Sequence, residues 1–93
     1  MFIIELTYIV ALEQVDAHLV EHREFLNKAY NQGLVMLSGR KNPPTGGFII
    51  SLHQNIADVQ QWLKEDPYEK FKLTDYKITE ITPTEYHSDL TKG

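Results

Sequence analysis

The sequence contains no cysteine. Disulfide bonds, zinc sites built from thiolates and cysteine nucleophiles are therefore excluded. Positive charge is also scarce, because nine lysine and arginine residues stand against thirteen acidic ones and the formal net charge is −4. The nine basic residues are scattered from Arg23 to Lys92, whereas nucleic-acid binding needs a concentrated basic surface. We therefore expect no nucleic-acid partner.

Long hydrophobic runs are missing as well. The most apolar stretch, residues 1–10, is interrupted by Glu5, and no basic residue precedes Arg23. It lacks the basic start of a signal peptide and is too short to span a bilayer. We therefore expect a cytoplasmic protein without membrane contact.

The length of 93 residues suits one domain. We predict a single domain over residues 1–86 and a polar C-terminal tail over residues 87–93. A chain of this length has a small hydrophobic core, and pairing with a second copy of the chain would bury more apolar surface.

Hydrophobic periodicity separates strands from helices along the chain. Residues 2–8 alternate as a strand does, and apolar residues three and four apart then predict a helix over residues 13–32, with Gly33 as its C-cap. Asn55 is the predicted N-cap of a second helix, and a short helical turn follows Asp66-Pro67. The remaining predicted strands cover residues 34–39, 48–52 and 76–82, with a Gly/Pro loop over residues 40–47.

This order, βαββαβ, predicts an α+β, ferredoxin-like fold. It consists of a four-stranded antiparallel sheet with two helices on one face, and its first and third strands are central. Both faces of that sheet carry apolar residues, because we expect Ile3 and Ile49 on one side and Ile4 and Ile50 on the other. An uncovered apolar face is usually a contact surface. We therefore predict a homodimer that packs sheet against sheet.

The segment from His18 to His22 matches the H-x-x-E-H string of some zinc peptidases. A catalytic zinc site also needs a third protein ligand and a cleft, which this small domain does not provide. The loop over residues 43–47 lacks the Lys-Ser/Thr ending of a phosphate-binding loop. We therefore expect neither a metal nor an organic cofactor.

His22 falls within the apolar stripe of its helix. It is either a core histidine with a backbone hydrogen bond or a partly buried imidazole suited to proton transfer. Asp66 also has two readings. With Pro67 and Glu69 it forms a good helix start, or its carboxylate contacts His22 and orients the ring. The sequence separation alone leaves both pairs of alternatives open.

Ser38 and Gly39 end the predicted second strand. They are either a strand terminus that needs small residues or a place where a ligand meets the backbone and an anionic oxygen is held. If a ligand binds here, the charges of Arg40 and Lys41 favour an acidic one. If none binds, the same two residues are those of an ordinary solvated loop.

Several of these residues form an ordered set that resembles the YciI-like (YCII-related) family from residue 2 to about residue 86. The segments that carry the resemblance are Leu6-Thr7-Tyr8, His22-Arg23-x-Phe25-Leu26, Ser38-Gly39, Thr45-Gly46-Gly47, Asp66-Pro67-Tyr68 and Ile81-Thr82-Pro83.

The resemblance implies a ferredoxin-like subunit that pairs into a dimeric α/β barrel, with a cleft that holds a His–Asp pair. By motif, His22 and Asp66 match that pair, and Ser38 and Gly39 match small residues of the same cleft. A few members resemble cofactor-independent lyases that act on small, often aromatic molecules, while most have no assigned reaction. This sequence departs from the pattern at Arg40, where the family commonly has proline.

We therefore expect a small-molecule enzyme, a lyase or isomerase, that works by proton transfer without a cofactor. His22 and Asp66 are the predicted catalytic residues, and the predicted ligand-binding residues are Tyr8, Ser38, Gly39 and Arg40. The expected ligand is a small acidic or aromatic molecule. The alternative is a non-catalytic dimeric module that binds a small ligand or assists a partner enzyme.

Overall fold

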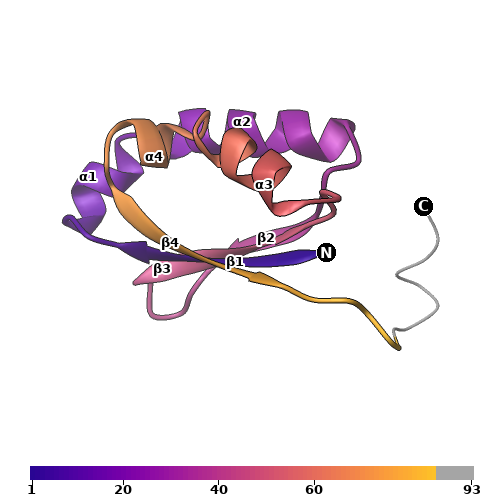
Figure 1. The fold of residues 1–93 in the computed structure, drawn as a ribbon. Helices are drawn as coiled ribbons and strands as arrows, with labels where there is room; N and C mark the ends of the chain where they lie inside the picture. Colours follow the sequence, from indigo (N-terminus) through magenta and orange to yellow (C-terminus); the bar gives the residue numbers. More distant parts are fainter. Residues whose placement is uncertain (86–93) are drawn as a thin grey trace.

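A computed structural model describes residues 1–85 of the chain (Figure 1). The predicted tail over residues 87–93 lies outside the described residues. The elements in chain order are β1 (Phe2–Tyr8), α1 (Leu12–Asp16), α2 (Leu19–Asn31), β2 (Val35–Arg40), β3 (Gly46–Ser51), α3 (Ile56–Leu63), α4 (Pro67–Lys70) and β4 (Thr74–Glu80).

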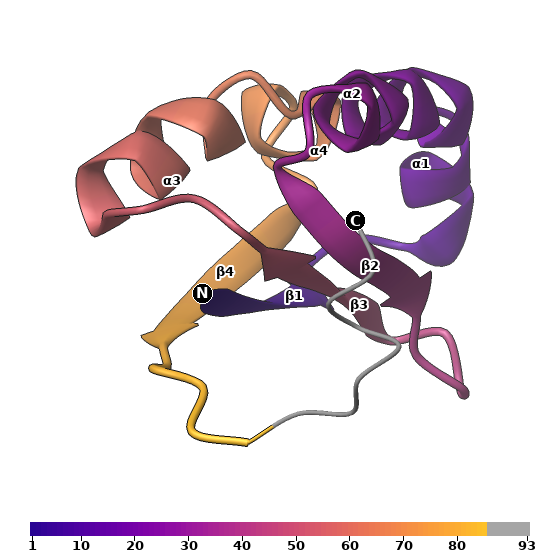
Figure 2. The same ribbon diagram turned by 90° about the vertical axis from the view of Figure 1, so that its right-hand side faces the viewer.

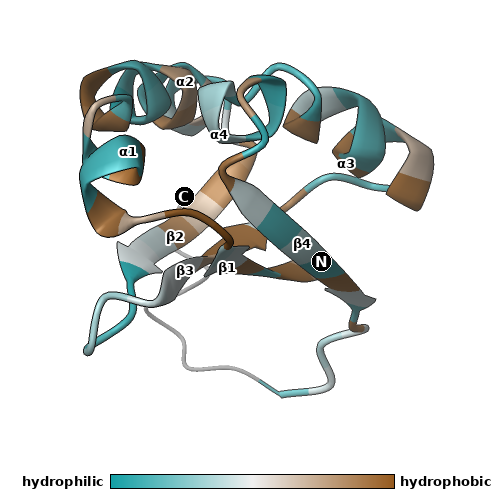
Figure 3. Ribbon diagram, turned by 90° about the vertical axis from the view of Figure 1, so that its left-hand side faces the viewer, coloured by the Kyte–Doolittle hydropathy of each residue, from teal (hydrophilic) through white to brown (hydrophobic). Residues whose placement is uncertain are grey.

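The four strands form one antiparallel sheet in the order β2-β3-β1-β4. The α+β, ferredoxin-like prediction is confirmed, including the central place of β1 and β3. All four helices lie on one face of the sheet (Figures 1 and 2). Edge strand β4 is mostly hydrophilic, as Figure 3 shows, in keeping with an edge that has to avoid further pairing.

The prediction of one continuous helix over residues 13–32 was wrong. The amide of His18 bonds to the carbonyl of Val15, three residues back, and the carbonyl of His18 then accepts the amide of His22 at 3.0 Å. These bonds close α1 with a tight turn and start α2 anew. The apolar stripe continues across the break, so the periodicity held no sign of it.

The two glycines that were predicted to lie in the loop belong to β3. A Cβ atom on Gly46 would lie 1.9 Å from the carbonyl oxygen of Leu6, and one on Gly47 would lie 2.6 Å from that of Gly39. Glycine is needed at these positions for close approach of neighbouring strands rather than for a turn.

The predicted grouping of the isoleucines across strands was also wrong. The register pairs Ile4 with Ile49 and Ile3 with Ile50. Ile4 and Ile49 are buried under the helices, so Ile3 and Ile50 share the opposite face. Alternation fixes the side within each strand, but it does not fix the offset between two strands.

The core lies between the sheet and the helices. It joins residues of β1 and β3 to apolar side chains from each of the four helices. Its fully buried members are Phe2, Ile4, Val15, Ala29, Ile49 and Val59.

The opposite face of the sheet, which we call the open face, carries a mixed surface. Leu37 and Phe48 are exposed there, beside Ile3 and Ile50. Lys41 Nζ donates to Glu5 Oε2 at 2.7 Å and lies 5.3 Å from the centre of the Phe48 ring. In residues 1–85, no helix is both long and apolar enough to cross a membrane.

Candidate functional site

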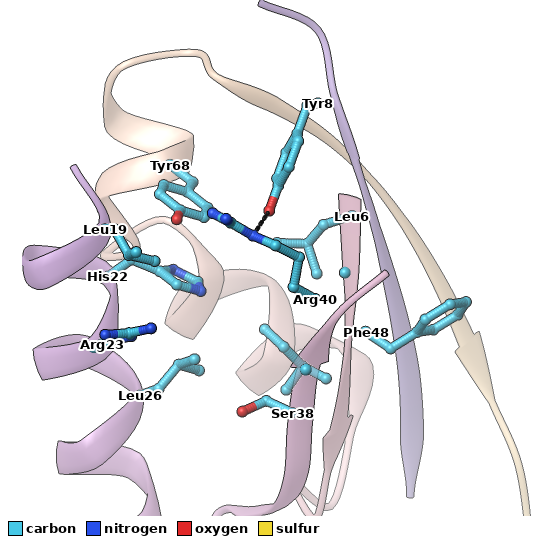
Figure 4. A pocket seen from close by; sticks show the side chains of 13 residues that line it. Leu6, Tyr8, Leu19, His22, Arg23, Leu26, Ser38, Arg40, Phe48 and Tyr68 are labelled. Atoms are coloured by element: carbon cyan, nitrogen blue, oxygen red, sulfur yellow. Dashed lines mark hydrogen bonds between the residues drawn. The ribbon is translucent and has the colours of Figure 1, made fainter. Parts of the chain in front are cut away.

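A cavity of about 320 Å³ lies between helix α2, helix α4 and the sheet (Figure 4). Its size is at the small end of the range for ligand pockets. It is lined by Leu6, Tyr8, Leu19, His22, Arg23, Leu26, Ser38, Gly39, Arg40, Gly47, Phe48, Ile49 and Tyr68. All of the predicted site residues except Asp66 therefore line one cavity. The side chain of Phe48 points away from it, as Figure 4 shows.

His22 and Asp66 are in direct contact. His22 Nδ1 lies 2.8 Å from Asp66 Oδ1, across 44 residues of sequence. Since a carboxylate can only accept, Nδ1 carries the proton of the neutral ring in this hydrogen-bond network. Nε2, at the far side of the ring, is then the nitrogen with a free lone pair next to the cavity.

The carboxylate of Asp66 is fully buried and receives three hydrogen bonds. Besides the His22 bond, Oδ1 accepts the backbone N–H of Tyr68 at 3.0 Å, and Oδ2 accepts the hydroxyl of Tyr76 at 2.9 Å. Asp66 is thus the N-cap of α4 and the partner of His22 at the same time. The structure thus contains both contacts that the sequence suggested, the helix cap and the contact with His22, because the two carboxylate oxygens can accept several hydrogen bonds.

The Tyr68 ring holds the imidazole of His22 from one side. The ring centroids are 3.9 Å apart and the planes differ by 5°. Tyr68 is buried, and burial raises its pKa to about 12, so the phenol stays neutral. Stacking on one face and a hydrogen bond at one edge together fix the orientation of His22.

Arg40 places a positive charge at the cavity. Its Nε donates to the Tyr8 hydroxyl at 3.0 Å, and its Nη2 donates to Asp16 Oδ1 at 2.5 Å. The hydrogen bond with Asp16 raises the pKa of Arg40 further above its ordinary value. Both side chains of the ion pair are more than a third exposed, so its own contribution to stability is small.

Ser38 and Gly39 line the cavity in different ways. The Ser38 hydroxyl lies 2.7 Å from that of Tyr30. Either hydroxyl can donate in this pair, and when Tyr30 donates, the Ser38 proton is left for a ligand in the cavity. Gly39 pairs with Phe48 of β3. A Cβ atom on Gly39 would therefore point to the open face, as the Phe48 side chain does, and would meet no neighbour within 4 Å. Gly39 thus contributes only its backbone to the cavity.

Two tyrosines of the site were missed from the sequence. Tyr68 follows Asp66-Pro67 directly, and its place in that motif was a usable signal. Tyr76 gave none, because its contact with Asp66 depends on how β4 pairs with β1.

The two histidines of the H-x-x-E-H string have separate surroundings. His18 stacks on Phe71 with ring centroids 4.2 Å apart, and its Nδ1 lies 3.4 Å from Glu21 Oε2. His22 faces Asp66 instead. Within residues 1–85 no three His, Asp or Glu side chains are grouped so that they could hold a metal ion.

Comparison with known proteins finds a family profile that matches the sequence. The profile of the YCII-related domain matches residues 1–82 of the chain. No curated protein matches it.

A solved structure with a similar fold is that of 5-chloro-2-hydroxyhydroquinone dehydrochlorinase (TftG) from Burkholderia phenoliruptrix AC1100, in complex with 2,5-dihydroxybenzoquinone. The two sequences are 17% identical, and the match covers 87% of this chain and 92% of that chain with a TM-score of 0.76. At this identity the likeness shows the fold alone. Since the family profile covers most of the sequence, the chain belongs to the family of the YCII-related domain.

Proposed function

We propose that the protein is a cofactor-independent enzyme that moves a proton on a small molecule, as lyases and isomerases do. The observation that carries the proposal is the hydrogen bond between His22 Nδ1 and the buried carboxylate of Asp66. It leaves Nε2 of His22 as a base that can take a proton from a molecule in the cavity. Asp66 orients the ring and stabilises the imidazolium that forms.

The remaining side chains of the cavity suit an acidic ligand with a flat ring. Arg40 would pair with a carboxylate or an enolate oxygen, and the hydroxyl of Ser38 would hold a second oxygen. The rings of Tyr8 and Tyr68 lie edge to face with centroids 6.3 Å apart and would contact the flat part of the ligand. The oxygenated six-membered ring bound by the dehydrochlorinase agrees with a ligand of this kind.

Exchange of carbon-bound hydrogen in D2O tests the chemistry without knowledge of the product. Phenylpyruvate is a suitable first probe, because it combines a carboxylate, a ring and a weakly acidic C–H group next to a carbonyl. It heads a series of small aromatic acids with exchangeable C–H groups. We expect the protein to accelerate deuterium incorporation, and His22→Ala to reduce that acceleration by about 10²–10⁴-fold.

His18→Ala is the matched control, because it removes a histidine from the same part of the chain and leaves the cavity lining intact. Full exchange activity in His22→Ala would contradict the assignment of the base. Binding of these acids without any exchange would instead favour the non-catalytic binding module.

We also propose that the protein is a homodimer that pairs through the open face. Leu37, Phe48, Ile3 and Ile50 give this face an apolar centre, and a chain of this length gains stability by covering it. Sedimentation at micromolar concentration should give twice the mass of the chain. Phe48→Asp should shift the protein to monomer, whereas Val20→Asp, at an exposed apolar residue of α2, should not. A wild-type monomer would contradict the proposal.

A further inference from the structure

The second oxygen of Asp66 has a partner outside the cavity. Tyr76 Oη donates to Asp66 Oδ2 at 2.9 Å. Tyr76 comes from edge strand β4 and lines a separate hollow of about 310 Å³, with Leu63, Glu69 and Ile78 among its neighbours there. His22 lines the cavity, Tyr76 lines this hollow, and Asp66 lies between them without lining either.

The Tyr76 hydroxyl accounts for an oxygen that would otherwise be buried without a partner. Among residues 1–85, Oδ1 receives two hydrogen bonds and Oδ2 receives this one alone. Burial raises the pKa of Tyr76 above its ordinary value, and the nearby Asp66 carboxylate raises it further. The hydroxyl therefore keeps its proton and acts as a donor throughout the neutral range.

We propose that Tyr76 is a positioning residue that sets the proton affinity of His22 through Asp66. A donor on Oδ2 draws negative charge away from the oxygen that faces His22, so Asp66 stabilises the imidazolium less than a carboxylate without this donor would. It also prevents rotation of the carboxylate about its Cβ–Cγ bond. This inference rests on the proposed proton-transfer function, in which the proton affinity of His22 decides how well it works as a base.

Titration of the His22 ring by NMR measures the effect without a substrate. The protein has four histidines, and His22→Gln identifies the signal of interest. In Tyr76→Phe we expect the titration midpoint of His22 to rise by roughly 0.5–1 pH unit, because the Asp66 carboxylate loses one charge-assisted bond and becomes a stronger partner. In Asp66→Asn the midpoint should fall.

A double variant separates this coupling from a merely structural effect. In the Asp66→Asn background, Tyr76→Phe should leave the midpoint almost where Asp66→Asn puts it, since the charge that transmits the effect is gone. Tyr30→Phe is the control, because it removes a hydroxyl that bonds to Ser38 and not to Asp66, and it should not move the midpoint.

The outcomes distinguish this inference from the proposed function. If Asp66→Asn moves the midpoint and Tyr76→Phe does not, the role of Tyr76 is refuted and the His22–Asp66 pair stands. If Tyr76→Phe has the same effect in both backgrounds, Tyr76 acts on His22 by another route and the inference is also refuted. If Asp66→Asn has no effect, the pair itself is refuted.

Discussion

Removal of the Asp66 side chain is the perturbation with the most calculable effect on stability. In Asp66→Ala, helix α4 loses its N-cap, which costs about 1 kcal/mol. The His22 Nδ1–H and the Tyr76 hydroxyl also lose their acceptor, and an unsatisfied buried donor costs about 1–3 kcal/mol. We expect water to enter the space that the removed side chain leaves, from the cavity lined by His22 and from the hollow lined by Tyr76, and to offset part of this cost. We therefore expect a loss of about 3 kcal/mol in the free energy of unfolding.

Asp66→Asn is the matched variant. Its side-chain oxygen can still cap α4 and accept from His22, so the expected loss is smaller, about 1–2 kcal/mol. Unfolding in urea at a fixed protein concentration measures both, with the fluorescence of Trp62, the sole tryptophan, as the signal. A total stability of about 5–15 kcal/mol is typical for a domain, so a loss of this size is easily measured. If both variants unfold within 0.5 kcal/mol of the wild type, on the order of measurement error, the three contacts do not stabilise the fold as described.

Two further predictions concern residues outside the cavity. Burial lowers the pKa of His53 from its ordinary value of 6.5, although Asp58 opposes the shift. Below about pH 6.5 the unfolded chain therefore binds a proton more readily at His53 than the folded chain does, and the free energy of unfolding should fall as the pH drops. Urea midpoints at about pH 7.5 and pH 5.5 should differ less in His53→Gln than in the wild type, and equal differences would contradict this reason. Gly46→Ala would place a methyl group against the Leu6 carbonyl oxygen. We expect the free energy of unfolding in urea to fall by about 1–3 kcal/mol. An unchanged urea midpoint would show that the two strands can move apart at no cost.

The order of the elements and the central strands followed from the sequence, because alternation and helical periodicity are local properties. The register did not follow. Ile3 was predicted to share a face with Ile49, whereas it pairs with Ile50 and shares the face of that residue, since the offset between strands depends on the whole chain. The break between α1 and α2 at His18 was also missed. The apolar stripe continues through it, so the helical periodicity gives no sign of the break.

The candidate site was predicted in part. His22 and Asp66 were identified by motif, and their separation in sequence gave no distance. The fold supplies the distance of 2.8 Å by placing the start of α4 beside α2. Tyr76 was missed because a tyrosine on an edge strand has no local mark of function, and only the pairing of β4 with β1 brings its hydroxyl to Asp66.

The proton on the neutral His22 ring tests the central claim most directly. Nitrogen-15 NMR of the wild-type protein above the His22 transition shows which ring nitrogen carries it. If His22 is a base held by Asp66, the proton lies on Nδ1 and Nε2 is free, and Asp66→Asn weakens that preference. A neutral ring protonated on Nε2 in the wild type would contradict the account, because the nitrogen beside the cavity could not then accept a proton.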